Sequence, residues 1–150
     1  MDDFSAAPGV PNSYGLTGGG ANAVEPGKRM LSSMAPTILE RDGRLLMVLG
    51  SPGGSTIPTS IFQVILNVVD HDMDMQDAVS APRFHHQWLP DSIQVEPLAV
   101  ATADSLKLVS MGHRFKARRS MGRVDAILRL SDGRLEGGAD PRGEDEAAGY

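Results

Sequence analysis

The chain has 150 residues, of which 41% are hydrophobic and 22% charged, a composition typical of a globular domain with one hydrophobic core. Its formal net charge of −5 leaves no basic footprint for nucleic acid, and no apolar run approaches the roughly 20 residues of a membrane span. Because cysteine is absent, disulfides, thiolate catalysis and cysteine-ligated metal sites are excluded.

The first part of the chain is irregular and the next part predicts a hairpin. Residues 1–28 are rich in Gly, Pro, Ala and Asn, so they form either a disordered tail or a functional loop ordered against other residues. Two strands are predicted at 37–40 and 45–49, joined by the turn signal Asp42-Gly43. Their near-continuous apolar character predicts burial on both faces.

Three helices are predicted in the middle of the chain. Apolar residues recur at helical spacing over 56–70, and a second, short helix over 74–80 has an aspartate as its N-cap. A third helix is predicted over 103–111, with Thr102 as its cap and Gly112 as its terminator.

A second hairpin closes the predicted fold. Strands at 124–130 and 134–138 flank the turn signal Asp132-Gly133. The order of strands, helices and strands predicts an α/β (α+β) fold in which sheet layers are covered by helices.

The most informative local feature is the pair Gly53-Gly54, between a predicted strand and a predicted helix. Without Cβ atoms, the backbone can come close to a ligand, and N–H groups just before a helix favour a negative charge. An oxyanion hole for acyl transfer can be built in this way from main chain alone. The alternative is a tight strand-to-helix turn. The spacing matches neither a Walker A loop nor GxGxxG, so phosphate binding is not expected.

Two pairs of polar residues near the start of the chain are further candidates. Ser32 and Ser33 could hold a carboxylate with their hydroxyls, although paired serines are common in loops. Asp2 and Asp3 could pair with an ammonium group, although exposed acids near a terminus are usually only solvated.

Residues 83–88 combine the only tryptophan, Trp88, with the adjacent histidines His85 and His86. Adjacent histidines do not face one site in a regular element and HExxH spacing is absent, so no metal site is predicted. We expect a structural cluster in which Trp88 is buried and the histidines are hydrogen-bonded. Spacing alone does not assemble a Ser-His-Asp triad.

Seven runs in order along the chain resemble the small subunit of gamma-glutamyltransferase (gamma-glutamyl transpeptidase), and the closing AGY resembles the C-terminus of that family. The runs are MDDFS (1–5), PGVPN (8–12), ANAV (21–24), LSSM (31–34), GSPGGS (50–55), APRFHHQWLPD (81–91) and DPR (140–142).

The resemblance implies an N-terminal-nucleophile hydrolase fold, an αββα sandwich of which this chain holds a part. Such enzymes cleave themselves into a large and a small subunit. The new N-terminal threonine then attacks the gamma-glutamyl amide of glutathione or a similar substrate, and water or an amino acid or peptide takes the glutamyl group. No metal or organic cofactor is implied. Bacterial members are periplasmic or secreted, whereas this chain displays no signal peptide.

The resemblance also implies roles for individual residues. Asp3 would bind the alpha-ammonium group of the substrate, and Ser32 and Ser33 would hydrogen-bond its alpha-carboxylate. Gly53 and Gly54 would donate main-chain N–H groups to the tetrahedral oxyanion.

A division of the chain follows from the same resemblance. Residues 1–28 would be a lid and substrate loop region, in which Tyr14 is an aromatic gate, and 29–150 would be the core of sheets and helices. Met1 is internal in the family, so we expect the nucleophilic threonine to lie upstream, and an arginine that binds substrate to lie in the large subunit. The partners are then the large subunit and the missing part of the small subunit.

Two alternatives remain open. A related acylase would act on glutaryl-type side chains, but such a substrate has no alpha-ammonium group for Asp3 to bind. A non-catalytic glutamate-binding or assembly module, left from a split or truncated gene, would keep the recognition residues without the nucleophile.

Overall fold

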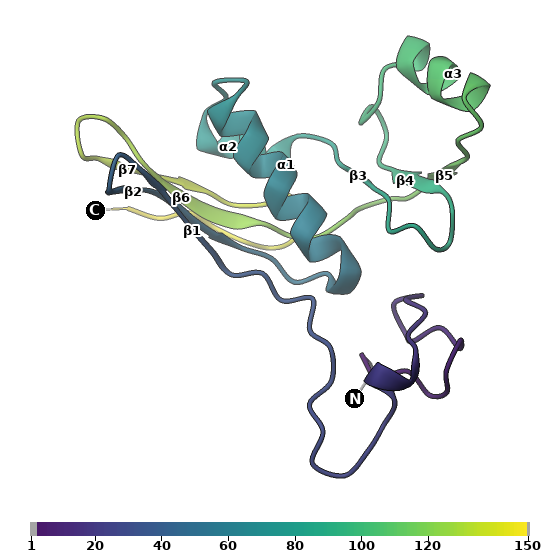
Figure 1. Ribbon diagram of the computed structural model, residues 1–150. Helices are drawn as coiled ribbons and strands as arrows, with labels where there is room; N and C mark the ends of the chain where they lie inside the picture. Colours follow the sequence, from purple (N-terminus) through teal and green to yellow (C-terminus); the bar gives the residue numbers. More distant parts are fainter. Residues whose placement is uncertain (1–2, 150) are drawn as a thin grey trace.

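The computed structural model describes residues 3–149 and contains two sheets and three α-helices (Figure 1). The larger sheet is antiparallel throughout, in the order β1 (Thr37–Arg41), β2 (Arg44–Gly50), β6 (Asp125–Arg129) and β7 (Leu135–Gly138). The smaller sheet has the order β3 (Phe84–His85), β4 (Ile93–Val95) and β5 (Phe115–Ala117). The helices are α1 (Ile57–Val69), α2 (Met75–Ser80) and α3 (Thr102–Ser110), with the 3-10 helices η1 (Gly20–Asn22) and η2 (Gly54–Thr56).

Both predicted hairpins are confirmed, and each turn contains a glycine with positive φ. Asp42 and Gly43 both have positive φ, of 53° and 71°, as a two-residue type I′ turn requires. In the second hairpin Gly133 has φ 90°, and the Asp132 carboxylate accepts a hydrogen bond from the Arg134 N–H at 3.0 Å. The local turn chemistry therefore sets the register of β1–β2 and of β6–β7.

The predicted α+β fold is confirmed: α1 and α2 cover one face of the larger sheet (Figure 1). Apolar residues of this face and of the two helices form one buried core. Its largest members are Met47, Leu49, Ile57, Ile61, Val64, Met75, Val79, Val124 and Leu128. No helix in the described part of the chain is long and apolar enough to cross a bilayer.

Within the described residues, the opposite face of the larger sheet is left open over β1 and β2, and Ala147 approaches it only at Gly137 of β7, so the prediction that the first two strands are buried on both faces is wrong. Burial alternates along β2, where Met47 and Leu49 are buried and their neighbours are not. Ile38, Val48 and Ile127 are register partners across three strands on the outer face, and Ile38 is 71% exposed. These apolar residues form a continuous uncovered row.

The helix ends confirm two predicted boundaries and correct one. The Asp74 side chain accepts a hydrogen bond from the Asp77 N–H at 2.7 Å and so caps α2. Gly112, with φ 97°, ends α3 through a 2.9 Å hydrogen bond from its N–H to the Val109 carbonyl. Thr102 is not the cap of α3 but its first residue, and the N-cap position is held by Ala101, which offers no side-chain acceptor.

The sequence did not predict the smaller sheet. Its strands have only two or three residues, too few to show an alternating pattern. The pair β4–β5 is parallel, with α3 in the connection, whereas β3–β4 is antiparallel. The smaller sheet is therefore mixed, whereas the larger sheet is antiparallel throughout.

A buried network of four charged side chains joins the two sheets. Arg83 and Arg142 both pair with Asp140, at 2.8 and 3.0 Å, and Arg142 also binds Glu96. Arg83, Glu96 and Asp140 are at most 5% exposed. Because these residues follow α2, β4 and β7, the network fixes the position of the smaller sheet relative to the core.

The carboxylates of this network also accept main-chain hydrogen bonds. Asp140 accepts from the N–H groups of Val124 and Arg142, and Glu96 accepts from those of Arg83 and Met121. Burial alone would raise the pKa of both carboxyls. The hydrogen bonds and the neighbouring guanidinium groups outweigh burial and hold both pKa values below their ordinary range.

Replacing Asp140 by asparagine should destabilise the fold strongly. The variant Asp140→Asn leaves two buried guanidinium groups without their shared counter-charge, which typically costs about 3–5 kcal/mol of the free energy of unfolding. Urea unfolding followed by circular dichroism measures the loss. Asp132→Asn is the control, because Asp132 pairs with Arg134 at the surface, and its unfolding midpoint should stay at the wild-type value. Equal midpoints in both variants would contradict the structural role of the network.

Stability should fall in acid through the same carboxyls. Because their folded-state pKa values are lowered, the stability that they contribute is complete above the unfolded pKa and is lost as the pH falls through the folded pKa. Urea midpoints measured from about pH 7 to about pH 3 should therefore decrease. The decrease should be shallower in Asp140→Asn, and an unchanged slope in that variant would argue against the assignment.

Candidate functional site

The glycine pair lies in a tight turn between β2 and η2. Gly53 has φ 142° and Gly54 has φ 58°, conformations that side-chain-bearing residues rarely adopt. The Gly53 carbonyl accepts hydrogen bonds from the N–H and the hydroxyl of Thr56, at 3.3 and 2.9 Å. Because this carbonyl is turned into the start of the helix, the turn is fixed from within.

The N–H groups of the turn are available to a ligand. Within residues 3–149, neither the Gly53 nor the Gly54 N–H donates a hydrogen bond. Gly53 is the N-cap of η2 and Gly54 is its first residue, directly before α1, where the aligned peptide dipoles favour a negative charge. The arrangement therefore offers two main-chain donors to an anion or a developing oxyanion.

A second glycine, Gly122, packs against the glycine turn. A Cβ at Gly53 would lie 3.2 Å from the Gly122 Cα, and a Cβ at Gly122 would lie 2.7 Å from the Ser60 hydroxyl. The Ser51 hydroxyl accepts a hydrogen bond from the Arg123 N–H at 3.0 Å, which ties the same segment to the turn. The glycine pair thus rests on the chain that leads into β6.

Tyr14 lies against the glycine turn. A Cβ placed on Gly54 would overlap the Tyr14 ring, so the ring occupies the space directly over this glycine. The loop that carries Tyr14 is closed by the Asn12 side chain, whose amide oxygen accepts from the N–H groups of Tyr14 and Leu16 at 3.0 Å. In Figure 1 this N-terminal segment lies beside the start of α1.

Asp3 belongs to the same N-terminal unit. Its carbonyl accepts hydrogen bonds from the side-chain amides of Asn12 and Asn22, at 3.2 and 2.7 Å. These bonds fix the backbone at Asp3, while no hydrogen bond to its carboxylate occurs among the described residues. Asp2, the other predicted acid, lies outside the described residues.

Ser32 and Ser33 lie in the irregular segment between η1 and β1. The Ser32 hydroxyl accepts a hydrogen bond from the Met34 N–H at 3.2 Å, within the same segment. This stretch loops away from the body of the protein before it enters β1 (Figure 1). The structure therefore brings Tyr14 to Gly54 but shows no contact of the two serines with the turn in the part of the chain that it describes.

The histidine cluster has a different arrangement from the expected one. His85 is buried and contacts the Thr59 hydroxyl at 2.8 Å, and His86 contacts Asp91 at 3.3 Å, so the predicted hydrogen bonding of both histidines is confirmed. Trp88 is 76% exposed, so its predicted burial is wrong. Trp88 has a positive φ of 70° and lies in a loop outside the core. No group of three potential metal ligands occurs among residues 3–149.

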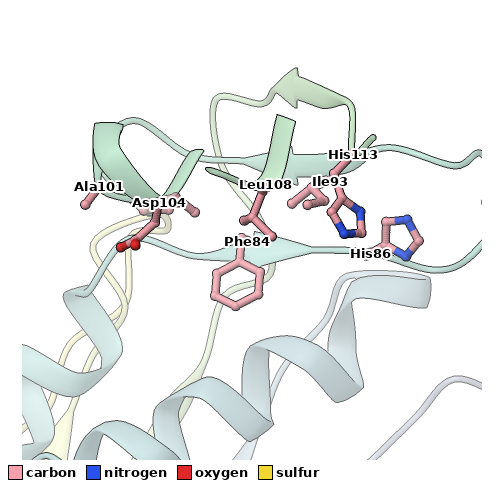
Figure 2. Close-up of a pocket in the computed structure, with 9 residues that line it drawn as sticks. Phe84, His86, Ile93, Ala101, Asp104, Leu108 and His113 are labelled. Carbon is pink, nitrogen blue, oxygen red and sulfur yellow. The ribbon is translucent and has the colours of Figure 1, made fainter. Parts of the chain in front are cut away.

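A cavity lies elsewhere, between α3 and the smaller sheet. It has a volume of about 460 Å³ and a mainly apolar lining that includes Phe84, Ile93 and Leu108, with His86, His113 and Asp104 at its edges (Figure 2). None of the predicted site residues lines it. The glycine turn is the better candidate because it holds two adjacent main-chain N–H groups that have no hydrogen-bond partner within residues 3–149.

One polar residue beside the turn was missed by sequence reasoning. Gln87 accepts a hydrogen bond from the Ser55 hydroxyl at 2.7 Å, directly after the glycine pair, and donates one to the Tyr14 carbonyl at 3.3 Å. Gln87 directly follows two histidines, for which only metal binding and structural hydrogen bonds were considered. No local pattern indicates that its side chain has hydrogen-bond partners far away in the sequence.

Comparisons with known proteins agree with the resemblance. The sequence model of the family described as Gamma-glutamyltranspeptidase matches residues 1–150. The chain is 51% identical over 152 residues to a glutathione hydrolase proenzyme of Escherichia coli (strain K12), a match that covers 100% of this chain and 26% of that protein. It is 51% identical over 148 residues to a glutathione hydrolase proenzyme of Pseudomonas aeruginosa, covering 95% of this chain and 26% of that protein.

Solved structures show the same fold. Gamma-glutamyltranspeptidase from Pseudomonas nitroreducens complexed with L-DON matches with a TM-score of 0.90 and 46% identity, over 100% of this chain and 79% of that chain. A mutant of Helicobacter pylori gamma-glutamyltranspeptidase matches with a TM-score of 0.89 and 48% identity, over 95% of this chain and 78% of that chain. The chain thus spans only 26% of the length of the curated relatives named above.

Adding a methyl group at Gly54 should displace the loop that carries Tyr14. In Gly54→Ala the new Cβ overlaps the ring, so amide hydrogen exchange over residues 8–19 should accelerate by about tenfold or more. Gly27→Ala is the matched control, because Gly27 also has positive φ, 71°, but nothing lies within 4 Å of its Cβ position. Equal exchange in the two variants would mean that backbone strain, and not the contact with Tyr14, is responsible.

Proposed function

The chain belongs to the gamma-glutamyltranspeptidase family, and from that premise we propose that it forms the substrate-binding and oxyanion-stabilising part of an enzyme that cleaves gamma-glutamyl amides. Relatives are named glutathione hydrolase proenzymes, so glutathione and similar compounds are the proposed substrates. Because the chain spans 26% of such a relative, the activity is proposed for the complete protein.

The glycine turn is the observation that carries this proposal. In the proposed reaction a threonine hydroxyl, supplied by the rest of the complete protein, attacks the gamma-carbonyl carbon of the substrate. The carbonyl oxygen becomes an oxyanion, and the N–H groups of Gly53 and Gly54 stabilise it. The C–N bond then breaks and the amine leaves with a proton, so that the glutamyl group remains on the threonine as an ester.

The second half of the reaction restores the nucleophile. Water or the amine of an acceptor attacks the ester carbonyl, and the same two N–H groups stabilise the second oxyanion. The threonine hydroxyl is released with a proton, and glutamate or a new gamma-glutamyl amide leaves. No metal or organic cofactor enters this chemistry, because the main-chain donors supply the stabilisation that a Lewis acid would otherwise give.

Recognition of the glutamyl group is proposed for three side chains. Asp3 would pair with the alpha-ammonium group, and the two hydrogen bonds to its main-chain carbonyl support this role because they fix the backbone from which the carboxylate extends. Ser32 and Ser33 would bind the alpha-carboxylate, which requires their irregular segment to lie against the site in the complete protein. Tyr14, over the glycine turn, would act as the gate.

The uncovered face of the larger sheet supports a partner. The row formed by Ile38, Val48 and Ile127 would be buried by a second sheet, as the αββα sandwich requires. The proposed partners are the large subunit and the remaining part of the small subunit.

Residues 1–28 are then the proposed lid and substrate region, and 29–150 the proposed core. We propose that the complete protein is exported to the periplasm or the medium.

A chimera tests the function directly. This chain replaces the matching segment of the Escherichia coli relative, which then supplies the remaining parts of the enzyme. The chimera should hydrolyse a chromogenic gamma-glutamyl anilide, whereas the isolated chain should be folded, by circular dichroism, but inactive. A processed and folded chimera without turnover would overturn the proposal and favour a non-catalytic module.

The role of Asp3 is tested in the same chimera. Asp3→Ala should lower kcat/KM by about 30-fold or more, because the alpha-ammonium group loses its counter-charge in a desolvated site. Glu25→Ala is the control, since Glu25 is an exposed carboxylate of the same region and should leave turnover unchanged. Near-normal turnover of Asp3→Ala would show that Asp3 does not bind the alpha-ammonium group.

A further inference from the structure

The Gln87 carboxamide uses all of its hydrogen-bonding positions. Its oxygen accepts from the Ser55 hydroxyl at 2.7 Å and faces the Nε2 atom of His85 at 2.9 Å. Its nitrogen donates to the carbonyls of Tyr14 and Leu89, at 3.3 and 3.0 Å. A primary amide offers two donors and one oxygen with two lone pairs, so this side chain is fully satisfied.

The orientation of this amide is fixed by its surroundings. Two carbonyls face the Gln87 nitrogen, so the oxygen must point toward His85. His85 therefore donates from Nε2, and its Nδ1 atom faces the Thr59 hydroxyl at 2.8 Å, which also donates to the Thr56 carbonyl at 3.0 Å. Burial lowers the pKa of His85, which keeps the ring neutral near pH 7, although the hydrogen bond to Gln87 partly opposes that shift.

These contacts connect two parts of the site. Ser55 lies in η2 and Thr59 in the first turn of α1, so both partners belong to the segment that follows the glycine turn. Tyr14 belongs to the N-terminal loop, and its neighbour Gly15 also approaches Gln87, because a Cβ there would lie 3.6 Å from the Gln87 nitrogen. Gln87 is thus the hydrogen-bonded link between the loop and the turn.

We propose that Gln87 is a positioning residue that latches the loop of Tyr14 closed over the glycine turn. Gln87 acts through Tyr14 and not on the substrate. The kinetic part of this inference rests on the proposed function, whereas the latch itself is a property of the chain. Loss of the latch reduces the population of the closed loop, and the apparent affinity for substrate falls by the same factor.

A matched pair of substitutions isolates the latch. Gln87→Glu keeps the shape of the side chain but replaces the donor nitrogen by an oxygen, which repels the carbonyls of Tyr14 and Leu89. Gln63→Glu makes the same chemical change at a glutamine whose nitrogen donates to the carbonyls of Thr59 and Phe84 and that, within residues 3–149, has no bond to the N-terminal loop.

Hydrogen exchange on the 150-residue chain gives the first readout. Over residues 8–19, exchange should accelerate about threefold to tenfold in Gln87→Glu, in line with the loss of one hydrogen bond, and stay at the wild-type rate in Gln63→Glu. Wild-type exchange in Gln87→Glu, or equal acceleration in both variants, would overturn the proposal.

Kinetics of the chimera give the second readout. Gln87→Glu should raise KM about threefold to tenfold at an unchanged kcat, because bound substrate restores the closed loop. A residue that only maintains the fold would lower the active fraction and leave KM unchanged, and that result would overturn the positioning role. If the unmodified chimera shows no turnover, the proposed function fails, and hydrogen exchange still decides the latch by itself.

Discussion

The buried pairing of Arg83 and Arg142 with Asp140 and Glu96 is the interaction on which the rest of the structure depends. Asp140 and Glu96 also hold the N–H groups of Val124 and Met121, and between these two residues lies Gly122, which supports the glycine turn. Arg83 immediately precedes β3, the strand that carries His85 toward Gln87. This network of charges is not part of the proposed reaction. It nevertheless positions both the Gly122 segment, which packs against the glycine turn, and the strand that leads to Gln87.

The proposed site combines a rigid part with an adjustable part. The glycine turn is rigid, because the Gly53 carbonyl is bonded to Thr56 and its backbone is packed against Gly122. The N-terminal loop is held to it by few contacts, chiefly the ring of Tyr14 on Gly54 and the bond from Gln87. Stabilisation of an oxyanion requires donors fixed in advance, whereas entry of substrate requires a cover that can move. The two parts answer these different requirements.

The sequence predicted what local chemistry determines. Asp42-Gly43 and the capping aspartate of α2 act within four residues, and the glycine pair before α1 predicted a turn with main-chain donors for the same reason. The smaller sheet, the exposure of Trp88 and the bond from Gln87 to Tyr14 depend on partners far away in the sequence, which no local pattern encodes. For Asp3, Ser32 and Ser33 the residues alone left both a binding role and a merely solvated loop open, the resemblance assigned the roles, and these stay predictions. The burial expected for both faces of β2 failed because the described residues supply a layer on one side only.

The contact between Gly53 and Gly122 has a consequence for how this protein can vary. Neither position has room for a side chain, since a Cβ on Gly53 would meet the Gly122 backbone and a Cβ on Gly122 would meet the side chains of Ser60 and Ser51. Both residues have positive φ, so even a compensating change nearby would leave the backbone unfavourable. Each of these two positions, distant in the chain, therefore requires glycine for two separate reasons, its crowded surroundings and its backbone conformation, so that a mutational library that randomises both should return glycine at each.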